Sequence, residues 1–258
     1  MKIGKKAKGK KGGGQAPSRA SGKKRKSLKR VFALAVLIAA ALGGVAVAQL
    51  ALIPNVSSLK TKTPKRTAIM LQRMREHEQR GEPYRIQHQM VPLSQISKNL
   101  RWAVIVSEDA AFYGHAGIDF EELRASLQKD LEEMKVARGG STITMQLARN
   151  LYLSTSRSPL RKAREIVIAR AMEAELSKSR ILELYLNSVE WGEGIFGCEA
   201  AAGSYFGVSC ADLSPEQGAL MAAVLPNPLR RNVLIPSKTV LWKQRWILTA
   251  MSKRGVPK

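Results

Sequence analysis

After residue 65, apolar residues recur every three or four positions through most of the chain, which is the spacing of an amphipathic helix. Strand signals are few, and residues 83–91 are the main candidate for an extended segment. We therefore expect one mainly α-helical domain over residues 66–258. The predicted helices cover residues 67–79, 94–108, 120–134, 142–153, 160–177, 179–187, 199–206, 216–224 and 239–253.

Several of these helices start at a residue whose side chain can accept hydrogen bonds from the first backbone N–H groups. Asp119 and Ser141 are the expected caps of the third and fourth helices. Ser158 is followed by Pro159, a residue that the first helical turn accommodates well. The glycine-rich stretch 192–197 instead predicts a flexible passage between two helices.

Residues 31–53 contain no charged side chain. At ~1.5 Å per residue, a helix of this length spans roughly 34 Å, enough to cross a hydrocarbon core of ~30 Å. We predict one transmembrane helix here. The alternative is a cleaved signal peptide, because Ala46-Val47-Ala48 resembles a cleavage site. We favour the membrane anchor because the apolar run continues beyond that site.

The first 30 residues contain thirteen Lys or Arg and no acidic residue, and removing these charges from the formal net charge of +23 leaves +10. Such a segment buries too little apolar surface to fold, so we expect it to be disordered. Basic residues that precede a membrane span remain in the cytoplasm, so the domain after the span is expected outside it. Residues 54–65 are interpreted as a linker.

Cys198 and Cys210 are the two cysteines of the chain. Outside the cytoplasm they could form a disulfide, and burial as two free thiols is the equal alternative. No Cys/His spacing indicates a structural zinc site.

Glu108 and Asp109 follow an apolar helix and precede Phe112, His115 and Gly117. A carboxylate at the end of an apolar helix face usually caps the helix, pairs with a cation or has a function. In an ordinary protein the ion pair is the usual case. The aromatic residue, histidine and glycine at close spacing favour a functional turn. His115 itself is interpreted as a structural hydrogen-bonding residue.

Two further polar blocks follow along the chain. Gly139-Gly140 stands directly before Ser141, and free backbone N–H groups at such a helix start bind anions or sugar oxygens. Taken by itself, this block is more simply explained by an ordinary helix cap. A group of cations then lies beside Glu165, and guanidinium groups hold phosphate oxygens in a bidentate manner. These cations are Arg149, Arg157, Arg161, Lys162 and Arg164. Arg161 and Lys162 stand four and three residues before Glu165, which predicts that they share one side of a helix with it.

With these blocks the chain resembles the peptidoglycan glycosyltransferases of glycosyltransferase family 51. Residues 108–119 match E-D-x-x-F-x-x-H-x-G-x-D, and residues 139–146 match G-G-S-T-I-T-x-Q. Residues 161–165 match R-K-x-x-E, and residues 178–187 match K-x-x-I-L-E-x-Y-L-N. A glycine-rich block over 192–206 is similar to the family's fifth motif. Because no transpeptidase sequence follows, we expect the monofunctional form.

The resemblance implies a lysozyme-like helical fold and an activity. The family polymerises lipid II: the donor is a glycan chain linked through pyrophosphate to a polyprenyl lipid, and the acceptor is the 4-hydroxyl of an incoming sugar. A β-1,4 bond forms with inversion and polyprenyl diphosphate leaves. Diphosphate is a competent leaving group once its charge is neutralised, whereas a glycosidase must protonate an alkoxide. This difference accounts for cations beside the carboxylates.

By the same resemblance, Glu108 is the general base, and Glu165 organises the cations or a divalent ion (Mg²⁺ or Mn²⁺) near the pyrophosphate. No other metal ligand is expected. Met145 stands where many members have glutamine, and Arg164 where lysine is common. Arg157→Ala is expected to weaken use of the donor. The expected substrate-binding residues are Asp109, Phe112, Ser141, Thr142, Gln146, Arg149, Arg157, Arg161, Lys162 and Arg164, of which Asp109 and Phe112 are expected to shape the site.

The implied partners are lipid II, the lipid-linked glycan chain, the membrane, and proteins of wall synthesis and division. The expected location is the bacterial inner membrane, with the N-terminus in the cytoplasm and the catalytic domain in the periplasm. Three rival interpretations are a lytic enzyme on the same glycan, a non-catalytic scaffold, and a membrane-bound nucleic-acid binder. The cation group opposes the first, the two carboxylates oppose the second, and the lack of interleaved aromatic residues opposes the third.

Overall fold

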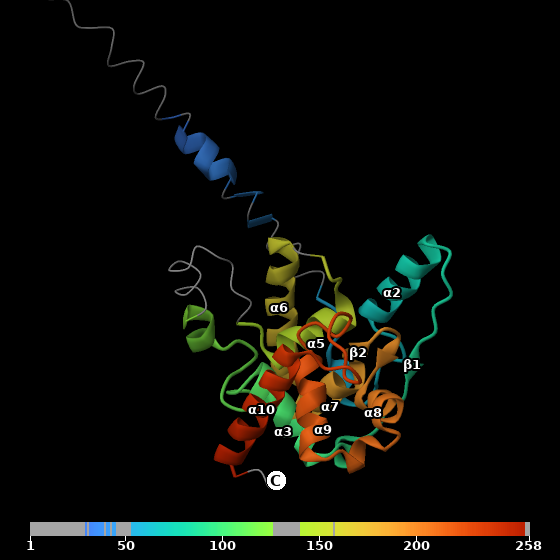
Figure 1. Ribbon diagram of the computed structural model, residues 1–258. Helices are drawn as coiled ribbons and strands as arrows, with labels where there is room; N and C mark the ends of the chain where they lie inside the picture. The colour runs from blue at the N-terminus through green and yellow to red at the C-terminus, as the bar shows by residue number, and fades with distance from the viewer. Residues whose placement is uncertain are drawn as a thin grey trace, which may run out of the picture. The chain divides into compact units, whose positions relative to one another are not determined.

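The computed structural model describes residues 29, 31–38, 40–41, 43–44, 53–125, 140–156 and 158–255. The chain divides into two compact units, Met1–Leu52 and Ile53–Lys258. The described part of the second unit is mainly helical, which confirms the prediction of a mainly α-helical domain (Figure 1). Its helices are α2 (Ala68–Gln79), α3 (Lys98–Glu108), α5 (Ile143–Tyr152), α6 (Pro159–Glu175), α7 (Lys178–Ser188), α8 (Cys198–Phe206), α9 (Pro215–Val224) and α10 (Lys238–Lys253).

In the first unit, the described residues between 29 and 44 are helical and exposed. Their side chains include Phe32 and Leu37, which are large, apolar and uncovered. The transmembrane helix predicted over 31–53 lies partly outside the described residues, which lack 39, 42 and 45–52. Among the residues described, no helix combines the length and the apolar character needed to cross a membrane.

Local sequence explains where several helices begin. Ser158 accepts a hydrogen bond from the Arg161 N–H, and Pro159 occupies the first turn of α6. At the start of α9, Ser214 and Gln217 form a capping box, in which each side chain accepts the other residue's backbone N–H.

Two predicted helix starts were wrong. The helix expected from residue 94 begins at Lys98, because Ser97 caps it and Leu93–Gln95 forms the separate 3₁₀ turn η2. The cap of α5 is Thr142 and not Ser141: Thr142 accepts the Met145 N–H. Both hydroxyl residues suit a cap, so local sequence did not distinguish them. Of the predicted helix 120–134, residues 120–125 are helical and the remainder lies outside the described residues.

The glycine-rich stretch predicted as a flexible passage is instead ordered in a small sheet. Strands β1 (Gln87–His88), β2 (Glu190–Gly192) and β3 (Ile195–Phe196) pair in the order β1-β3-β2. β1 runs parallel to β3, and β2 runs antiparallel to β3 with an irregular register. Gly194, at φ +72°, makes the turn between β2 and β3, and a Cβ there would lie 2.5 Å from the Arg85 carbonyl oxygen. Close packing, and not flexibility, therefore requires this glycine.

Two groups of packed helices form the body of the second unit. One contains α3, α9 and α10, which lie side by side in Figure 1, and the other contains α5, α6 and α7, with α2 against α5. Both groups contribute to one continuous apolar core. The end of α3 thereby meets α5 at Gln146, and α5 meets α6 where Arg149 approaches Glu165.

Part of the segment predicted as a linker is packed on the domain. The side chains of Val56 and Leu59 are buried in the main core, next to and within the 3₁₀ turn η1 (Ser57–Lys60). From α7, Arg180 Nε donates to the Leu59 carbonyl oxygen at 2.8 Å, and Arg180 Nη2 donates to Thr63 Oγ1 at 3.0 Å. These contacts fasten the first residues of the second unit to α7.

Cys198 and Cys210 are both buried free thiols. Burial, together with the neighbouring Cys210 thiol, raises the pKa of Cys198 well above its usual value.

Candidate active site

Glu108 is the last residue of α3, and three side chains contact its carboxylate. Lys243 Nζ, from α10, lies 3.3 Å from Oε1. Ser107 Oγ also donates to Oε1, at 3.0 Å. On the other side, Gln146 Nε2, from α5, donates to Oε2 at 3.2 Å. The side chain of Glu108 is 10% exposed, so it meets solvent over a small part of its surface. This carboxylate is held from both sides yet stays accessible.

The orientation of Gln146 is fixed from behind. The Tyr185 hydroxyl donates to Gln146 Oε1 at 2.8 Å, which turns the amide NH₂ group toward Glu108. Tyr185 is fully buried, and burial raises its pKa well above the usual value. The phenol therefore keeps its proton and remains a donor at neutral pH.

Lys243 is a site residue that sequence reasoning missed. Its burial between α10 and α3 lowers the pKa of its ammonium group, while the adjacent Glu108 carboxylate opposes that shift. No local motif marks it, because it lies 135 residues beyond Glu108 in the chain. The basic character of α10, which contains no acid, was the available signal.

Asp109 and Phe112 are both buried. Asp109 is 2% exposed: His115 Nε2 lies 2.8 Å from Oδ1, and the Ile143 N–H donates to Oδ2 at 2.9 Å. Burial raises the pKa of Asp109 against these two contacts. Phe112 is fully buried, with Lys178 Nζ 4.5 Å from its ring centre. Neither side chain is placed to contact a substrate directly.

The turn after Asp109 is joined to the start of α5. Thr142 Oγ1 donates to the Gly117 carbonyl oxygen at 2.7 Å, and the Gly117 N–H donates to His115 Nδ1 at 3.1 Å. Gly117 has φ +89°, and a Cβ there would lie 3.0 Å from Glu173 Cγ. Glycine is therefore required for this turn to pack against α6. Thr142 is buried and has a structural role here.

Glu165, on α6, is 1% exposed and is surrounded by three cations. Arg161 Nη1 pairs with Oε1, and Lys162 Nζ lies 2.9 Å from Oε2, which confirms that these residues share a helix face with Glu165. Arg149 Nη1, from α5, lies 3.9 Å from Oε1. Lys162 also donates to Ser141 Oγ at 2.7 Å. Three positive groups around one negative group leave a net positive cluster.

One pocket of about 260 Å³ is lined by residues that contact each of the two carboxylates, although neither carboxylate lines it. Its wall includes Gln146, which contacts Glu108, and also Arg149 and Arg161, which contact Glu165. Gln146 and Arg149 are three residues apart on α5, so they project from the same side of that helix. The cavity therefore lies between Gln146, the amide that contacts Glu108, and the two arginines that contact Glu165.

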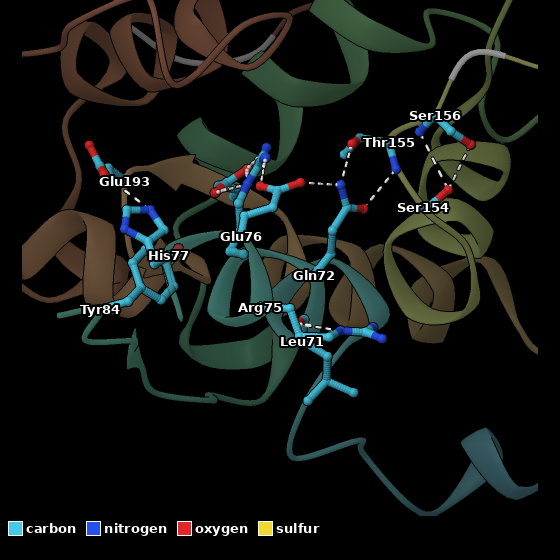
Figure 2. A network of polar contacts seen from close by, with 12 residues as sticks. Leu71, Gln72, Arg75, Glu76, His77, Tyr84, Ser154, Thr155, Ser156 and Glu193 are labelled. Atoms are coloured by element: carbon cyan, nitrogen blue, oxygen red, sulfur yellow. Dashed lines mark hydrogen bonds and ion pairs between the residues drawn. The ribbon is translucent and has the colours of Figure 1, made fainter. Parts of the chain in front are cut away.

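Helix α2 and strand β2 form the far wall of this pocket. Arg73 lines it together with Glu190, and Arg73 Nη2 lies 3.0 Å from Glu190 Oε2. Gln72 fastens α2 to the loop after α5: its Nε2 donates to Thr155 Oγ1 at 2.6 Å, and its Oε1 accepts the Thr155 N–H at 3.0 Å (Figure 2). Because the Arg73 guanidinium is occupied by carboxylates, this wall is close to neutral, and the positive charge lies on the opposite side.

The remaining predicted residues divide into three cases. Arg157 lies outside the described residues. Arg164 is half-buried on α6 beside Glu165. Met145 is buried in the core, so its replacement of a glutamine removes no polar group from the pocket. Among the described residues, no cluster of three or more His, Cys, Asp or Glu side chains is arranged to hold a metal ion.

Comparison with known proteins agrees with this geometry. The profile of the transglycosylase family matches residues 62–252. A biosynthetic peptidoglycan transglycosylase of Nitrosomonas eutropha is 41% identical over 198 residues, which are 77% of this chain and 81% of the relative. The protein of the same name from Neisseria meningitidis serogroup C is 41% identical over 79% of this chain and 87% of its own. One from Herminiimonas arsenicoxydans is 47% identical over 64% and 71%. The chain therefore belongs to the transglycosylase family.

Proposed function

We propose that this chain is a peptidoglycan glycosyltransferase that polymerises lipid II into β-1,4 glycan strands and releases polyprenyl diphosphate. The observation that supports it best is the shared pocket. One cavity is lined by Gln146, which contacts a carboxylate that can accept a proton, and by Arg149 and Arg161, which belong to a positive cluster that can hold a diphosphate. The names of the relatives agree with cell wall synthesis.

In the proposed reaction, Glu108 accepts the proton of the acceptor's 4-hydroxyl group. The hydroxyl oxygen forms a bond to the anomeric carbon of the donor chain, and the bond from that carbon to the diphosphate oxygen breaks. The electron pair of the broken bond leaves on the diphosphate. Attack opposite the leaving group inverts the configuration at the anomeric carbon. General base catalysis by a positioned carboxylate contributes roughly 10²–10⁴-fold to such a step.

The leaving diphosphate is stabilised by Arg149 and by the neighbouring cations of α6. Arg149 suits direct contact because its side chain is 34% exposed and its guanidinium is 3.9 Å from Glu165, beyond hydrogen-bonding distance. Arg161 and Lys162 are held in place by Glu165. Glu165 thus acts as a positioning residue, and Ser141 receives the Lys162 ammonium.

We propose that any Mg²⁺ or Mn²⁺ enters on the oxygens of the diphosphate and is not a ligand of Glu165. Three cationic side chains already surround that carboxylate, so a divalent ion there would face strong repulsion. The mechanism above assigns no step to a metal.

The proposed location is the bacterial inner membrane, with a cytoplasmic N-terminus and a periplasmic domain. Support comes from the uncharged run 31–53 and the basic tail before it. Side chains such as Phe32, 72% exposed in the first unit, also need an apolar environment. Retention of the full chain in the membrane pellet after alkaline carbonate extraction tests this anchor, and its release to the supernatant would contradict it.

The test of function is polymerisation by the purified full chain. Lipid II and finished glycan are supplied in separate reactions, and the products are separated by gel electrophoresis. Consumption of lipid II with growth of glycan strands is expected, and finished glycan is expected to persist. Cleavage of finished glycan without use of lipid II would instead establish the lytic activity. Glu175→Gln, an exposed carboxylate on α6, is the matched control.

A further inference from the structure

The last 42 residues of the chain, 217–258, contain eight Lys or Arg and no Asp or Glu. One of these cations, Lys243, is directed toward Glu108. Two more are occupied internally: Arg231 donates to the Ala223 carbonyl oxygen, and Arg254 donates to the Ala110 carbonyl oxygen. Among the others, Arg230, Lys238, Arg245 and Lys253 are exposed.

The outer face of α10 combines these cations with two exposed tryptophans. Trp242 is 61% exposed and Trp246 is 46% exposed, one helical turn apart. Lys238 and Arg245 are exposed on the same helix, at positions four before and three after Trp242, which places them on the same face. The opposite face is buried through Val240, Ile247 and Met251. The exposed face is thus apolar and cationic while the helix stays anchored in the core.

The loop before α10 continues this surface toward the pocket. Leu225, Pro226 and Pro228 line the pocket wall. Beyond them the loop exposes Leu234 at 63% and Ile235 at 79%. An apolar, cation-bearing strip therefore runs along the chain from the edge of the pocket to the middle of α10.

We infer that this strip, residues 229–246, contacts the surface of an anionic lipid bilayer. Tryptophan is enriched where protein meets lipid headgroups, and Lys or Arg beside it attracts anionic lipids. The absence of any acidic residue from 217 to 258 gives the strip the charge that such a surface requires. The nearest acid to α10 in sequence is Glu216, whose carboxylate accepts the Ser214 hydroxyl at 2.9 Å. Contact here would set the pocket edge at the lipid surface.

The inference deepens the proposed membrane location by adding a second point of contact, and its test does not require glycan synthesis. The full chain is reconstituted in vesicles of phosphatidylglycerol and phosphatidylcholine whose acyl chains carry bromine, a short-range quencher of tryptophan fluorescence. The chain has four tryptophans: Trp102, Trp191, Trp242 and Trp246. Trp191 is fully buried in the core and serves as an internal reference.

Quenching of roughly a third of the wild-type fluorescence is expected from two interfacial tryptophans among four. The variant Trp242→Phe/Trp246→Phe should lose most of this quenching, whereas the control Trp102→Phe, on α3, should keep it. Lys238→Gln/Arg245→Gln should weaken quenching several-fold in vesicles that contain phosphatidylglycerol and little in vesicles of phosphatidylcholine alone, and the control Arg75→Gln/Arg85→Gln should change neither.

Equal quenching of the double tryptophan variant and the wild type, or no quenching of either, overturns the inference. The inference is also overturned if the tryptophan fluorescence is unaffected by brominated lipid but changes with protein concentration. That result would assign the strip to contact between two copies of the chain. Polymerisation in detergent separates the two proposals. There the double tryptophan variant should be as active as wild type, whereas an inactive wild type would count against the proposed function alone.

Discussion

Glu108 and Glu165 are both glutamates that contact residues lining one pocket, yet their surroundings differ in charge. Glu108 faces one lysine, one amide and one hydroxyl group. Glu165 faces two arginines and a lysine and is almost completely buried. One positive charge balances Glu108, so its neighbourhood is near neutral, whereas the neighbourhood of Glu165 has an excess of positive charge.

The comparison assigns roles to two residues of the same type. A base must lose its negative charge when it takes a proton, and a near-neutral, partly open setting permits this. Protonation of a carboxylate held by three cations would remove the negative charge that balances them, so such a carboxylate is a poor proton acceptor. The excess positive charge around Glu165 can instead be shared with an incoming anion. Surroundings, and not residue type, thus separate a proton acceptor from an anion-binding scaffold.

The largest expected effect is on catalysis at Glu108. Glu108→Gln keeps the shape of the side chain and removes the base, so polymerisation of lipid II should fall by roughly 10²–10⁴-fold. The rate is measured as glycan formed by the purified full chain, and circular dichroism checks that the helical fold is retained. Near wild-type activity of Glu108→Gln, alongside the control Glu175→Gln, would mean that another group is the base.

Glu165→Gln should show its main effect on stability. Breaking a fully buried ion pair costs about 3–5 kcal/mol, and we expect a smaller loss here because the Lys162 and Arg149 side chains, 36% and 34% exposed, can regain water. A fall in the melting temperature and in the denaturant midpoint is expected, larger than that of Glu108→Gln. Lys162→Met/Glu165→Gln should recover part of this loss, since one uncompensated cation is removed. A melting temperature unchanged by Glu165→Gln would contradict the role of scaffold.

Arg149→Ala tests the anion-binding half directly. A hydrogen bond to a charged group is worth about 1.5–3 kcal/mol, so KM for the lipid-linked donor should rise by roughly 10–100-fold. Because Arg149 is partly exposed and does not hold Glu165 by a hydrogen bond, stability should change little. Arg75→Ala, an exposed arginine on α2, serves as the control. An unchanged KM would remove Arg149 from the diphosphate contact.

Lys243→Met tests the setting of Glu108. We expect kcat to fall by roughly tenfold, with KM within about twofold, because the Glu108 carboxylate is no longer held in position by the Lys243 ammonium group. Lys243→Arg should restore part of the rate.

A pH titration of stability provides a second measurement on Lys243. Because burial lowers the pKa of Lys243, the unfolded chain binds more protons than the folded one between the folded value and the unfolded value of about 10.4. This group therefore makes folding more favourable as pH rises through that window. The difference in unfolding free energy between wild type and Lys243→Met should show that slope, and a difference independent of pH would argue against burial of the charge.

Tyr185→Phe should give the smallest effect. It removes one hydrogen bond to Gln146 and leaves the ring in the core, which costs about 0.5–1.5 kcal/mol. A loss of activity of a few fold is expected, with the amide of Gln146 free to rotate. Tyr152→Phe, a partly buried tyrosine at the end of α5, is the control, and equal effects of the two variants would deny Tyr185 any specific role.

The sequence allowed prediction of what local patterns determine. Amphipathic spacing and Ser-Pro caps located α6 and α9 within a residue or two, and the pairing of Arg161 with Glu165 followed from helical geometry alone. The family resemblance singled out Gln146 and Arg149, and the structure brings both to the wall of one pocket. Their proposed roles in binding remain predictions.

What could not be predicted depends on packing between distant segments. Lys243 reaches Glu108 only because α10 packs against α3. The glycine-rich stretch became a strand pair because Gly194 meets the backbone of Arg85, a residue more than a hundred positions earlier. In the same way, Val56 and Leu59 joined the core because Arg180 of α7 holds their segment in place. None of these contacts leaves a periodic signal in the sequence.

The fixed amide of Gln146 has a consequence for where the collected proton can go. An amide nitrogen does not take up protons at physiological pH, and the Lys243 ammonium already holds all of its own, so neither neighbour offers an inward exit. The hydroxyl group of Ser107, the third neighbour, contacts the Ala222 carbonyl oxygen on its far side, at 3.4 Å, and a backbone carbonyl does not take up a proton. None of these three contacts carries the proton inward, so we expect it to leave from the exposed part of the Glu108 side chain before the next sugar reacts.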